Sequence, residues 1–510
     1  MSQPEIHRLV QSESCEIVDL NRPFSNFDYV EDHFGGNDAI RRLFSLSRRN
    51  HCNILVREDI PASGLIENEN NEIYGMYSNF EMRKLIRLTF WREFDERRPN
   101  QNNLVGYAIL KRDVVADMAV DRWHVFESVM PKYRHPHNCV PASRNYRVSV
   151  DGNEFSVNGV MYCQQNGLNK ACAQVALKSL CSLHMPDTNL SFQRINELAE
   201  CEEPSKGLSV TQIRNALDGL HVQYRDVDYT KVGGNARQDL PYQKYLYAGI
   251  ESGGGALLGF RFAGQAAHDE RHIIPFFGHT FNQDTWAPDA DVAYFHVGDQ
   301  TKYIPSESWM SSFIGHDDNF GSDYCVPRFY VSPEQTDYVV ELFAPGIHYS
   351  GMVAEAIGVD YLYSILTNLE DPKEKWLQRL VNSAQQQKVV LRTVALDKHQ
   401  YIQHLRSARD WEEKREAGAI SGFLEKHLPA HLWMVEVSIP QLFPCNQRKL
   451  GEIVLNASTQ PKFHRDFSAF ILSRLPEKYV FLQKVDDKGD PHFLTTPSNL
   501  KSHTKLFFKH

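Results

Sequence analysis

The sequence predicts an α+β protein, in which helices come first along a central region and a mostly antiparallel sheet follows them. Between residues 172 and 250, apolar residues recur at the three- and four-residue spacing of helix faces. Three glycines at 253–255 then break the chain, and the apolar runs 256–262 and 273–277 that follow are typical of strands. We expect two mixed α/β domains to flank this region.

The length and composition allow several domains with hydrophobic cores. The chain has 510 residues, of which 42% are hydrophobic and 23% are charged, a balance that is typical of globular proteins. This length suits two to four domains of roughly 100–200 residues each. We predict domains at residues 1–144, 145–334 and 335–510, and we assign no role to the first and the last.

The first predicted domain mixes helix and strand signals. The segments 38–46 and 80–90 both have the apolar spacing of amphipathic helices. Four arginines between residues 41 and 49 either form a contact patch or lie on a solvated helix face, and we favour the solvated face. The proline-rich stretch 131–141 is predicted to be a linker.

The central domain is predicted to open with a β-hairpin. From Asn145 the residues alternate in polarity, turn at Asp151-Gly152 and alternate again to residue 162. Helices are expected at 172–183, 190–198, 209–220 and 242–250, with a strand at 222–229. Ser209 and Gln212 have the spacing of a capping box at the start of the third helix.

The last predicted domain has strand patterns at 389–394, 432–438 and 479–482, and a charged helix pattern at 411–417. No internal repeat and no low-complexity tail is evident in the sequence. These signals favour a separate α/β domain.

The composition argues against several classes of function. A net charge of −9 gives no basic footprint for nucleic acid. The nine cysteines are odd in number and include no CxxC pair, so neither a zinc knuckle nor a disulfide framework is indicated. The N-terminal residues do not have the pattern of a signal peptide, and no run approaches the ~20 apolar residues of a membrane span. We expect a cytoplasmic protein, and the oligomeric state stays open.

Cys172 is the candidate nucleophile because it is predicted to lie at the N-terminus of a helix. A polar loop containing Gln165 precedes it, and the apolar helical pattern begins at Ala173. Unpaired backbone N–H groups and the helix dipole favour an anion there, and so lower a thiol pKa toward the thiolate form. The amides around Cys172 and the side chain of Gln165 can donate to an oxyanion. Most cysteines in such a chain are instead small apolar core residues.

A thiolate nucleophile needs a base, usually histidine, and a third group that orients the base. His272 opens the strand pattern 273–277, and we expect it to be the base. His279 follows Gly278 at the other end of this pattern and is the second candidate for this role. Either histidine can instead serve local turn hydrogen bonds.

The orienting group is expected at the end of the next strand pattern, where Asp317 and Asp318 lie. Asp284 and Asn282 are nearer to the histidines in sequence and are also candidates. The aspartates can also form a simple Asx turn. Adjacent carboxylates favour hard divalent cations, but only two lie there, so we expect neither a metal nor another cofactor.

This order of residues resembles the papain-like cysteine peptidases, and most closely their bacterial C39-like branch, over about residues 145–330. In that family a glutamine precedes the cysteine, a histidine heads a strand that ends in glycine, and an Asp or Asn caps the next strand. The resemblance implies a papain-like core in which Cys172 is the nucleophile, His272 the base, Asp317 or Asp318 the orienting acid, and Gln165 an oxyanion donor. Two features depart from the family: Gln165 lies seven residues before Cys172, one more than is usual, and the segment from His272 to Asp317 is long.

The sequence therefore predicts a cysteine peptidase that hydrolyses a peptide or isopeptide bond of a protein or peptide substrate through a thioester. One alternative is the same fold acting on a different amide, as a transglutaminase, deamidase or amidase. A second is an inactive peptidase-like binding module whose flanking domains are the working parts. The flanking domains can also position a substrate or keep the site closed.

Overall fold

The computed structural model describes residues 15–507, with gaps. The residues outside the description are 1–14, 133–137, 169–170, 186–189, 204–206, 234–239, 263–270, 282–290, 293–301, 368, 370–371, 408–424, 444–446, 463–465, 477, 486–490, 498–503 and 508–510. The described chain is a mixed α/β protein with several antiparallel sheets, as the sequence predicts at this coarse level.

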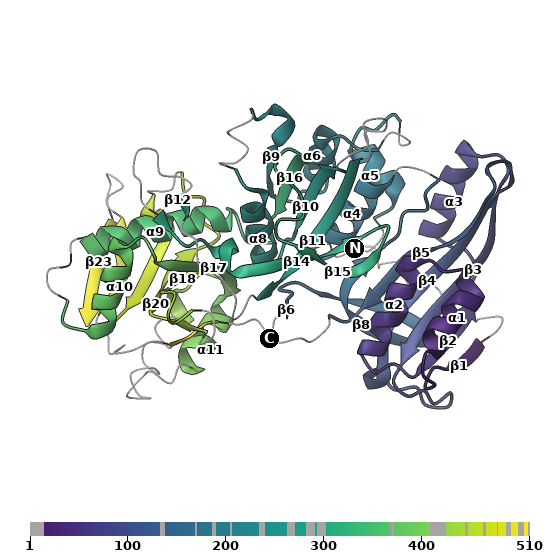
Figure 1. Ribbon diagram of the computed structural model, residues 1–510, viewed down its shortest axis with the longest axis horizontal. Helices are drawn as coiled ribbons and strands as arrows, with labels where there is room; N and C mark the ends of the chain where they lie inside the picture. Colours follow the sequence, from purple (N-terminus) through teal and green to yellow (C-terminus); the bar gives the residue numbers. More distant parts are fainter. Residues whose placement is uncertain are drawn as a thin grey trace. The chain divides into compact units, whose positions relative to one another are not determined.

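The N-terminal sheet has seven strands in the order β1-β2-β3-β4-β5-β8-β7. Its strands are β1 (Cys15–Asp19), β2 (Ile54–Asp59), β3 (Phe80–Trp91), β4 (Leu104–Val115), β5 (Val120–Met130), β7 (Arg144–Val150) and β8 (Asn153–Tyr162). Three helices accompany them: α1 (Ser25–Phe34), α2 (Asp38–Arg49) and α3 (Leu65–Met76). Helices α1 and α2 lie together on one face of the sheet (Figure 1), and their apolar residues share a core with β2–β5.

The segment 80–90 is a strand, so the helix predicted there is wrong. Ile86, Leu88 and Phe90 alternate along β3 and are fully buried. β3 pairs with β2 on one side and β4 on the other. Long-range pairing therefore overrides a local pattern that also fits a helix. The helix predicted from Asp38 is confirmed, with the Asn37 side chain accepting the Ile40 N–H as its cap.

The β7–β8 hairpin forms where the sequence predicts it, but it completes the N-terminal sheet. β8 pairs with β5, with Ser128 opposite Tyr162 and Met130 opposite Val160. The hairpin that we expected to open a second domain thus belongs with the strands that precede it.

The central region follows the predicted order, with helices followed by most of the strands of one sheet. Its helices are α4 (Cys172–Cys181), α5 (Phe192–Leu198), α6 (Val210–Gly219) and α8 (Tyr242–Ser252). The capping box of Ser209 and Gln212 forms at the start of α6. The sheet order is β15-β14-β11-β10-β16-β9, with the short β6 (Asn138–Cys139) paired to β11. These strands are β9 (Tyr224–Asp228), β10 (Ala256–Arg261), β11 (Arg271–Phe281), β14 (Met310–Asp317), β15 (Gly321–Pro327) and β16 (Thr336–Leu342).

The C-terminal sheet has the order β17-β18-β20-β21-β22-β23. These strands are β17 (Val390–Asp397), β18 (His431–Ser438), β20 (Gly451–Asn456), β21 (Phe470–Leu475), β22 (Lys478–Val485) and β23 (Pro491–Pro497). The helices are α9 (Gly351–Thr367), α10 (Lys375–Gln385) and α11 (Lys398–Ser407). Two small pairs complete the strands: β12 (Asp291–Val292) with β13 (Lys302–Tyr303), and β19 (Arg448–Lys449) with β24 (Thr504–Lys505).

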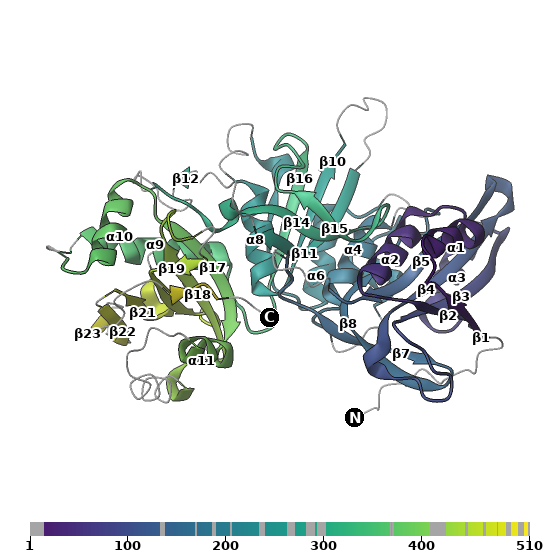
Figure 2. The same cartoon turned by 60° about the horizontal axis from the view of Figure 1, so that its bottom comes forward.

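The three predicted C-terminal strands are present as β17, β18 and β22, and the predicted helix 411–417 lies outside the described residues. Helices α9 and α10 lie over this sheet in both ribbon views (Figures 1 and 2). A side chain at Gly358 of α9 would meet Val435 of β18, so the helix approaches the strand closely there. This close packing explains why a glycine is present inside the helix, where glycine is less favourable than other residues.

The chain divides into two compact units whose bounds differ from the three predicted domains. The first unit contains residues 1–222, 257–276 and 314–326. The second contains residues 223–256, 277–313 and 327–510. All candidate site residues from Gln165 to Asp318 that the structure describes, except His279, belong to the first unit. Within the described part of the chain, no helix is long and apolar enough to cross a membrane.

Glu341 on β16 gives a pH-dependent stability prediction. It is fully buried, and only the Ser350 hydroxyl donates to its carboxyl group among the described residues, at 2.9 Å. Burial raises the pKa of Glu341 to about 8. As pH rises from ~4.3, the unfolded chain loses this proton while the folded chain keeps it, so stability falls by up to ~1.4 kcal/mol per pH unit until about pH 8.

We expect Glu341→Gln to match the wild type in melting temperature near pH 4 and to exceed it by several degrees at pH 8. Thermal unfolding at both pH values checks this. An equal difference between the two proteins at pH 4 and pH 8 would contradict the assignment.

Candidate active site

Cys172 is the first residue of α4, as its sequence context predicts. Cys172 is half-buried, whereas the residues from Ala173 to Cys181 are all buried. The preceding Ala171 makes no side-chain cap hydrogen bond to the first turn of the helix. Val175 anchors the helix in a core that it shares with β7 and β8. In both ribbon views α4 is drawn beside β11 (Figures 1 and 2).

The loop before α4 is held by the N-terminal sheet. The backbone N–H of Gln164 donates to the Val125 carbonyl at 2.8 Å, and the Gln164 side chain accepts the Val125 N–H at 3.1 Å. Asn166 is fully buried, donates to Glu69 at 2.9 Å and accepts the Leu168 N–H at 2.9 Å. Contacts on both sides of Gln165 therefore fix the backbone that carries it.

Gln165 connects this loop to the turn after β14. Its Nε2 donates to Oδ1 of Asn319 at 3.1 Å. The backbone N–H groups of Asn319 and Phe320 both donate to Oδ1 of Asp317, at 2.9 and 3.1 Å. The Asx turn that we considered as an alternative role is therefore present, and it leaves the second carboxylate oxygen of Asp317 for a different partner.

That partner is His272, on β11. Its Nε2 lies 3.1 Å from Oδ2 of Asp317 and 3.6 Å from Oδ1 of Asp318, and only 5% of the residue is exposed. The imidazole ring lies edge-on to Phe260 and stacks on Phe262, each with ring centroids 5.7 Å apart. The two rings and the carboxylate fix the imidazole orientation, so Nδ1 is the ring nitrogen left for proton exchange.

The pKa shifts of His272 and Asp317 favour an ion pair between a protonated imidazole and an ionised carboxylate. Burial lowers the pKa of His272, but the Asp317 hydrogen bond and the charges of Asp318 and Asp317 outweigh it, so the pKa is raised overall. Burial raises the pKa of Asp317, but His272 and the two backbone N–H groups of the turn outweigh it, so the pKa is lowered overall. Asp317 is thus the carboxylate that stays ionised and supports a protonated imidazole.

Asp318 differs from its neighbour. Burial raises the pKa of Asp318 to about 6, and neither of its carboxylate oxygens has a hydrogen-bond partner among the described residues. Of the two predicted orienting acids, Asp317 therefore has the better geometry. Asp284 and Asn282, the two candidates nearer to the histidines in sequence, lie outside the described residues.

His279 has a different partner. It is fully buried, its Nε2 lies 2.7 Å from Oε1 of Glu251, and its ring stacks on Tyr247. His279, the second candidate base, therefore has a local hydrogen-bond partner, which accounts for its burial without a catalytic role.

Two residues near the site were not singled out by sequence reasoning. Tyr162, at the end of β8, is buried, and burial with the charges of Asp318 and Asp317 raises the pKa of its hydroxyl well above the ordinary value. Arg42 of α2 donates to the carbonyls of Ser322 and Asp323, at 3.0 and 2.6 Å. The solvated face that we favoured for the arginines is wrong for Arg42, and no local pattern reveals a contact across 280 residues.

Arg42 holds the start of β15, which follows the turn after Asp317. A side chain at Gly321 would meet the Arg42 side chain, so α2 and the start of β15 are in close contact. We expect Arg42→Ala to lower the melting temperature by several degrees, because two backbone carbonyls lose a charged hydrogen-bond donor. Arg41→Ala is the matched control, since the Arg41 side chain is on the same helix and pairs with Glu31 and Asp38. Equal melting temperatures for the two variants would contradict this role.

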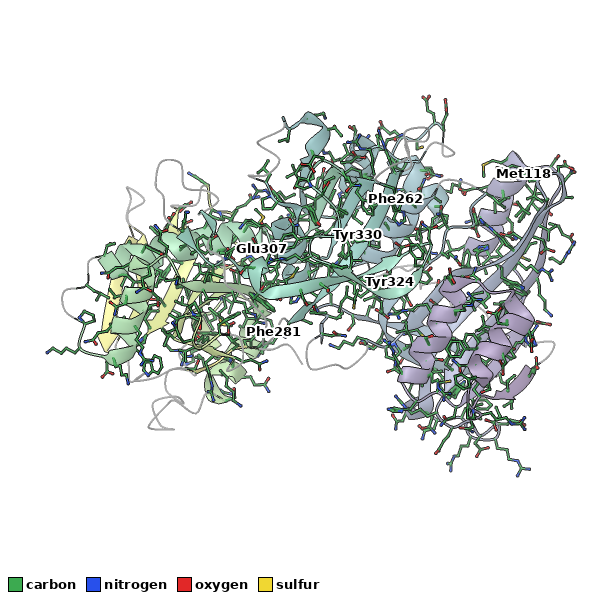
Figure 3. All side chains as sticks on the ribbon, in the orientation of Figure 1. Met118, Phe262, Phe281, Glu307, Tyr324 and Tyr330 are labelled. Atoms are coloured by element: carbon green, nitrogen blue, oxygen red, sulfur yellow. The ribbon has the colours of Figure 1, made fainter. Side chains whose placement is uncertain are left out.

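Three exposed aromatic side chains lie in strands, or at residues next to strands, of the sheet that carries His272 and Asp317, and one of them, Phe262, stacks on His272. Phe262 is 43% exposed, Phe320 47% and Tyr324 39%, and the Phe320 and Tyr324 rings lie 5.9 Å apart. Figure 3 labels Phe262 and Tyr324 on the ribbon.

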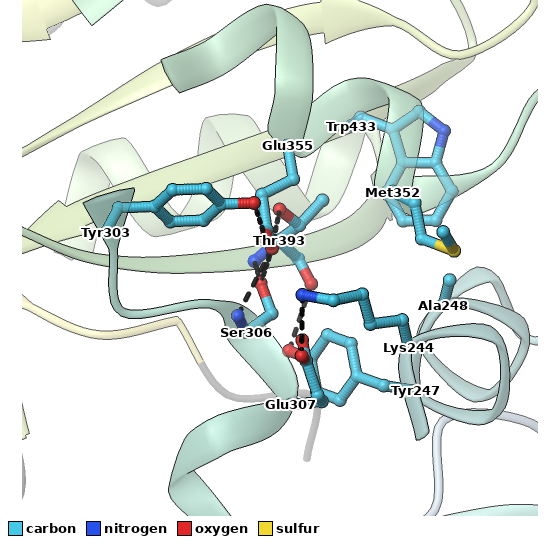
Figure 4. A pocket seen from close by; sticks show the side chains of 11 residues that line it. Lys244, Tyr247, Ala248, Tyr303, Ser306, Glu307, Met352, Glu355, Thr393 and Trp433 are labelled. Atoms are coloured by element: carbon cyan, nitrogen blue, oxygen red, sulfur yellow. Dashed lines mark hydrogen bonds and ion pairs between the residues drawn. The ribbon is translucent and has the colours of Figure 1, made fainter. Parts of the chain in front are cut away.

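A buried polar pocket in the second unit is too small for a substrate. Lys244 pairs with Glu307 at 2.8 Å, and Glu355 accepts from the Tyr303 hydroxyl at 2.8 Å (Figure 4). The space has about 10 Å³ for the centres of water molecules, enough for about one water. The polar groups of this pocket satisfy one another, and we assign them a structural role.

Comparison of the chain with protein-family models, with curated proteins and with solved structures found no match. The functional assignment therefore rests on the geometry of the site.

Proposed function

We propose that the protein is a cysteine-dependent hydrolase of amide bonds with a papain-like core, acting as a peptidase on peptide or isopeptide bonds. The observation that carries this proposal is the chain of contacts from His272 through Asp317 and Asn319 to Gln165, in the loop that leads to Cys172. Base, orienting acid and amide donor are thus connected, and the thiol begins the helix that follows.

Each residue has a defined task in the proposed reaction. The Cys172 thiolate attacks the substrate carbonyl, while His272 holds the thiol proton and Asp317 stabilises the imidazolium. The Gln165 side chain and the Cys172 backbone N–H stabilise the oxyanion. His272 gives its proton to the leaving amine, which leaves a thioester on Cys172. A water molecule, deprotonated by His272, then hydrolyses the thioester and restores the thiol.

Gln165 provides a prediction about the oxyanion. We expect Gln165→Ala to lower kcat by about 10²–10³ with little change in KM, because the lost hydrogen bond strengthens in the transition state. Gln101→Ala is the control, since that exposed glutamine contacts Ser156 elsewhere. A kcat within twofold of the wild type would remove Gln165 from the mechanism.

The proposal is tested by trapping the thioester. The purified protein is mixed with a peptide library and quenched in acid, and the peptide that contains Cys172 is examined by mass spectrometry. A hydroxylamine-sensitive acyl group on Cys172, together with new peptide termini, supports a cysteine peptidase.

The products separate a peptidase from the competing functions. Ammonia release or cross-linking without chain cleavage would indicate a deamidase or transglutaminase. The absence of both acylation and turnover across the library would contradict the enzymatic proposal and favour a binding module.

A further inference from the structure

His272, Asp317 and Asp318 form a compact set of potential metal ligands. The Nε2 of His272 and one carboxylate oxygen of each aspartate all lie within 4.8 Å of one another, and all three residues are buried. The sequence shows only the two adjacent carboxylates, whereas the fold adds an imidazole nitrogen from 45 residues away. The imidazole is a third potential ligand, which the argument from sequence against a metal did not include.

The carboxylate oxygens of Asp318 lack a hydrogen-bond partner among the described residues. The residue is only 4% exposed, and its Oδ1 faces Nε2 of His272 at 3.6 Å. A buried carboxylate without hydrogen bonds is costly unless a cation or a hydrogen-bond donor compensates it. Asp317 already fits a ligand role, since its Oδ1 is held by two backbone N–H groups while Oδ2 faces the imidazole.

The separations suit a small divalent cation. Zn²⁺ binds nitrogen and carboxylate oxygen at about 2.0–2.2 Å, so two ligands of one tetrahedral ion lie about 3.3–3.6 Å apart. The observed distances from Nε2, 3.1 Å and 3.6 Å, require only small movements. One imidazole and two carboxylates leave a fourth position open for water, and the imidazole favours Zn²⁺ over Ca²⁺ or Mg²⁺.

We infer that His272, Asp317 and Asp318 form a Zn²⁺ site, and that bound Zn²⁺ inhibits the thiol chemistry. A neutral imidazole carries one proton. When Zn²⁺ occupies Nε2, that proton lies on Nδ1, and the ring can no longer accept a proton from Cys172. The binding part of this inference is independent of the proposed function, whereas the inhibitory part rests on it.

Binding is measured by calorimetric titration of the full chain with Zn²⁺. We expect one Zn²⁺ per chain in the wild type and in Cys172→Ala with equal affinity, and affinity at least ~10-fold weaker in both Asp318→Asn and Asp318→Ala. Asp113→Asn is the matched control, because Asp113 is a buried carboxylate beside a different histidine, His124. Zn²⁺ binding that is absent, unchanged in the Asp318 variants or lost in Asp113→Asn or Cys172→Ala would overturn the site.

Inhibition is measured separately, as the rate of Cys172 alkylation by iodoacetamide with Zn²⁺ or with EDTA. We expect Zn²⁺ to slow alkylation at least ~10-fold in the wild type, EDTA to restore it, and Asp318→Asn to need at least ~10-fold more Zn²⁺ for the same effect. Equal rates with Zn²⁺ and EDTA in a wild type that binds Zn²⁺ would overturn the inhibition alone. A thiol that is unreactive even in EDTA would count against the proposed function, while the titration still decides the site.

Discussion

Replacing Cys172 with alanine is expected to abolish hydrolysis, lowering kcat by on the order of 10⁶, as removal of a nucleophile does in other covalent hydrolases. The variant retains the helix start and the Gln165 loop, because alanine is accepted at the first turn of a helix. The measurement is the rate of product formation on a peptide identified by the thioester experiment.

Cys201→Ala is the matched control for Cys172→Ala. Cys201 has the same intermediate exposure as Cys172 but follows α5 and does not begin a helix. We expect it to keep kcat within about twofold, since changes at sites away from the chemistry have small effects. Full activity in Cys172→Ala, or an equal loss in Cys201→Ala, would rule out Cys172 as the nucleophile.

Asp317→Asn is expected to lower kcat by about 10⁴, the size of effect seen when an orienting carboxylate becomes an amide. An amide holds the wrong tautomer of His272 and cannot stabilise the imidazolium. Asp318→Asn, measured in EDTA, is expected to lower kcat less than 10-fold, because Asp318 accepts no hydrogen bond from His272.

The contrast between these two isosteric variants assigns the orienting acid. Both residues are buried, and they are adjacent in sequence, so a general loss of folding would affect both variants in the same way. Equal effects would mean that the two carboxylates share the role. A larger loss in Asp318→Asn would contradict the assignment of Asp317.

The parts of the site that depend on local pattern were predictable from the sequence. Cys172 begins a helix because a polar loop meets an apolar periodic segment, and Asp317 ends a strand that precedes a glycine-containing turn. His272 lies at the start of β11, where the pattern changes to consecutive apolar residues. The starts and ends of these elements can be predicted because apolar periodicity and chain-breaking residues depend on only a few neighbouring residues.

The parts that depend on long-range contacts were not predictable. β3 has a pattern that fits a helix, and only its pairing with β2 and β4 makes it a strand. Arg42 holds the start of β15 and Glu69 holds the loop before α4, and these roles require contacts across 280 and 97 residues. For the same reason the N-terminal sheet could not be recognised from sequence as part of the scaffold that positions Gln165.

The central claim is that His272 activates Cys172. The most direct test is the pH dependence of Cys172 alkylation by limiting iodoacetamide, in EDTA between pH 5 and 9, with the labelled site assigned by mass spectrometry. We predict selective labelling of Cys172 with an apparent pKa well below the ~8.5 of an ordinary thiol, and a return toward ~8.5 in His272→Ala. Labelling of Cys172 that is slow, or that has the same pH profile in the wild type and in His272→Ala, would contradict the claim.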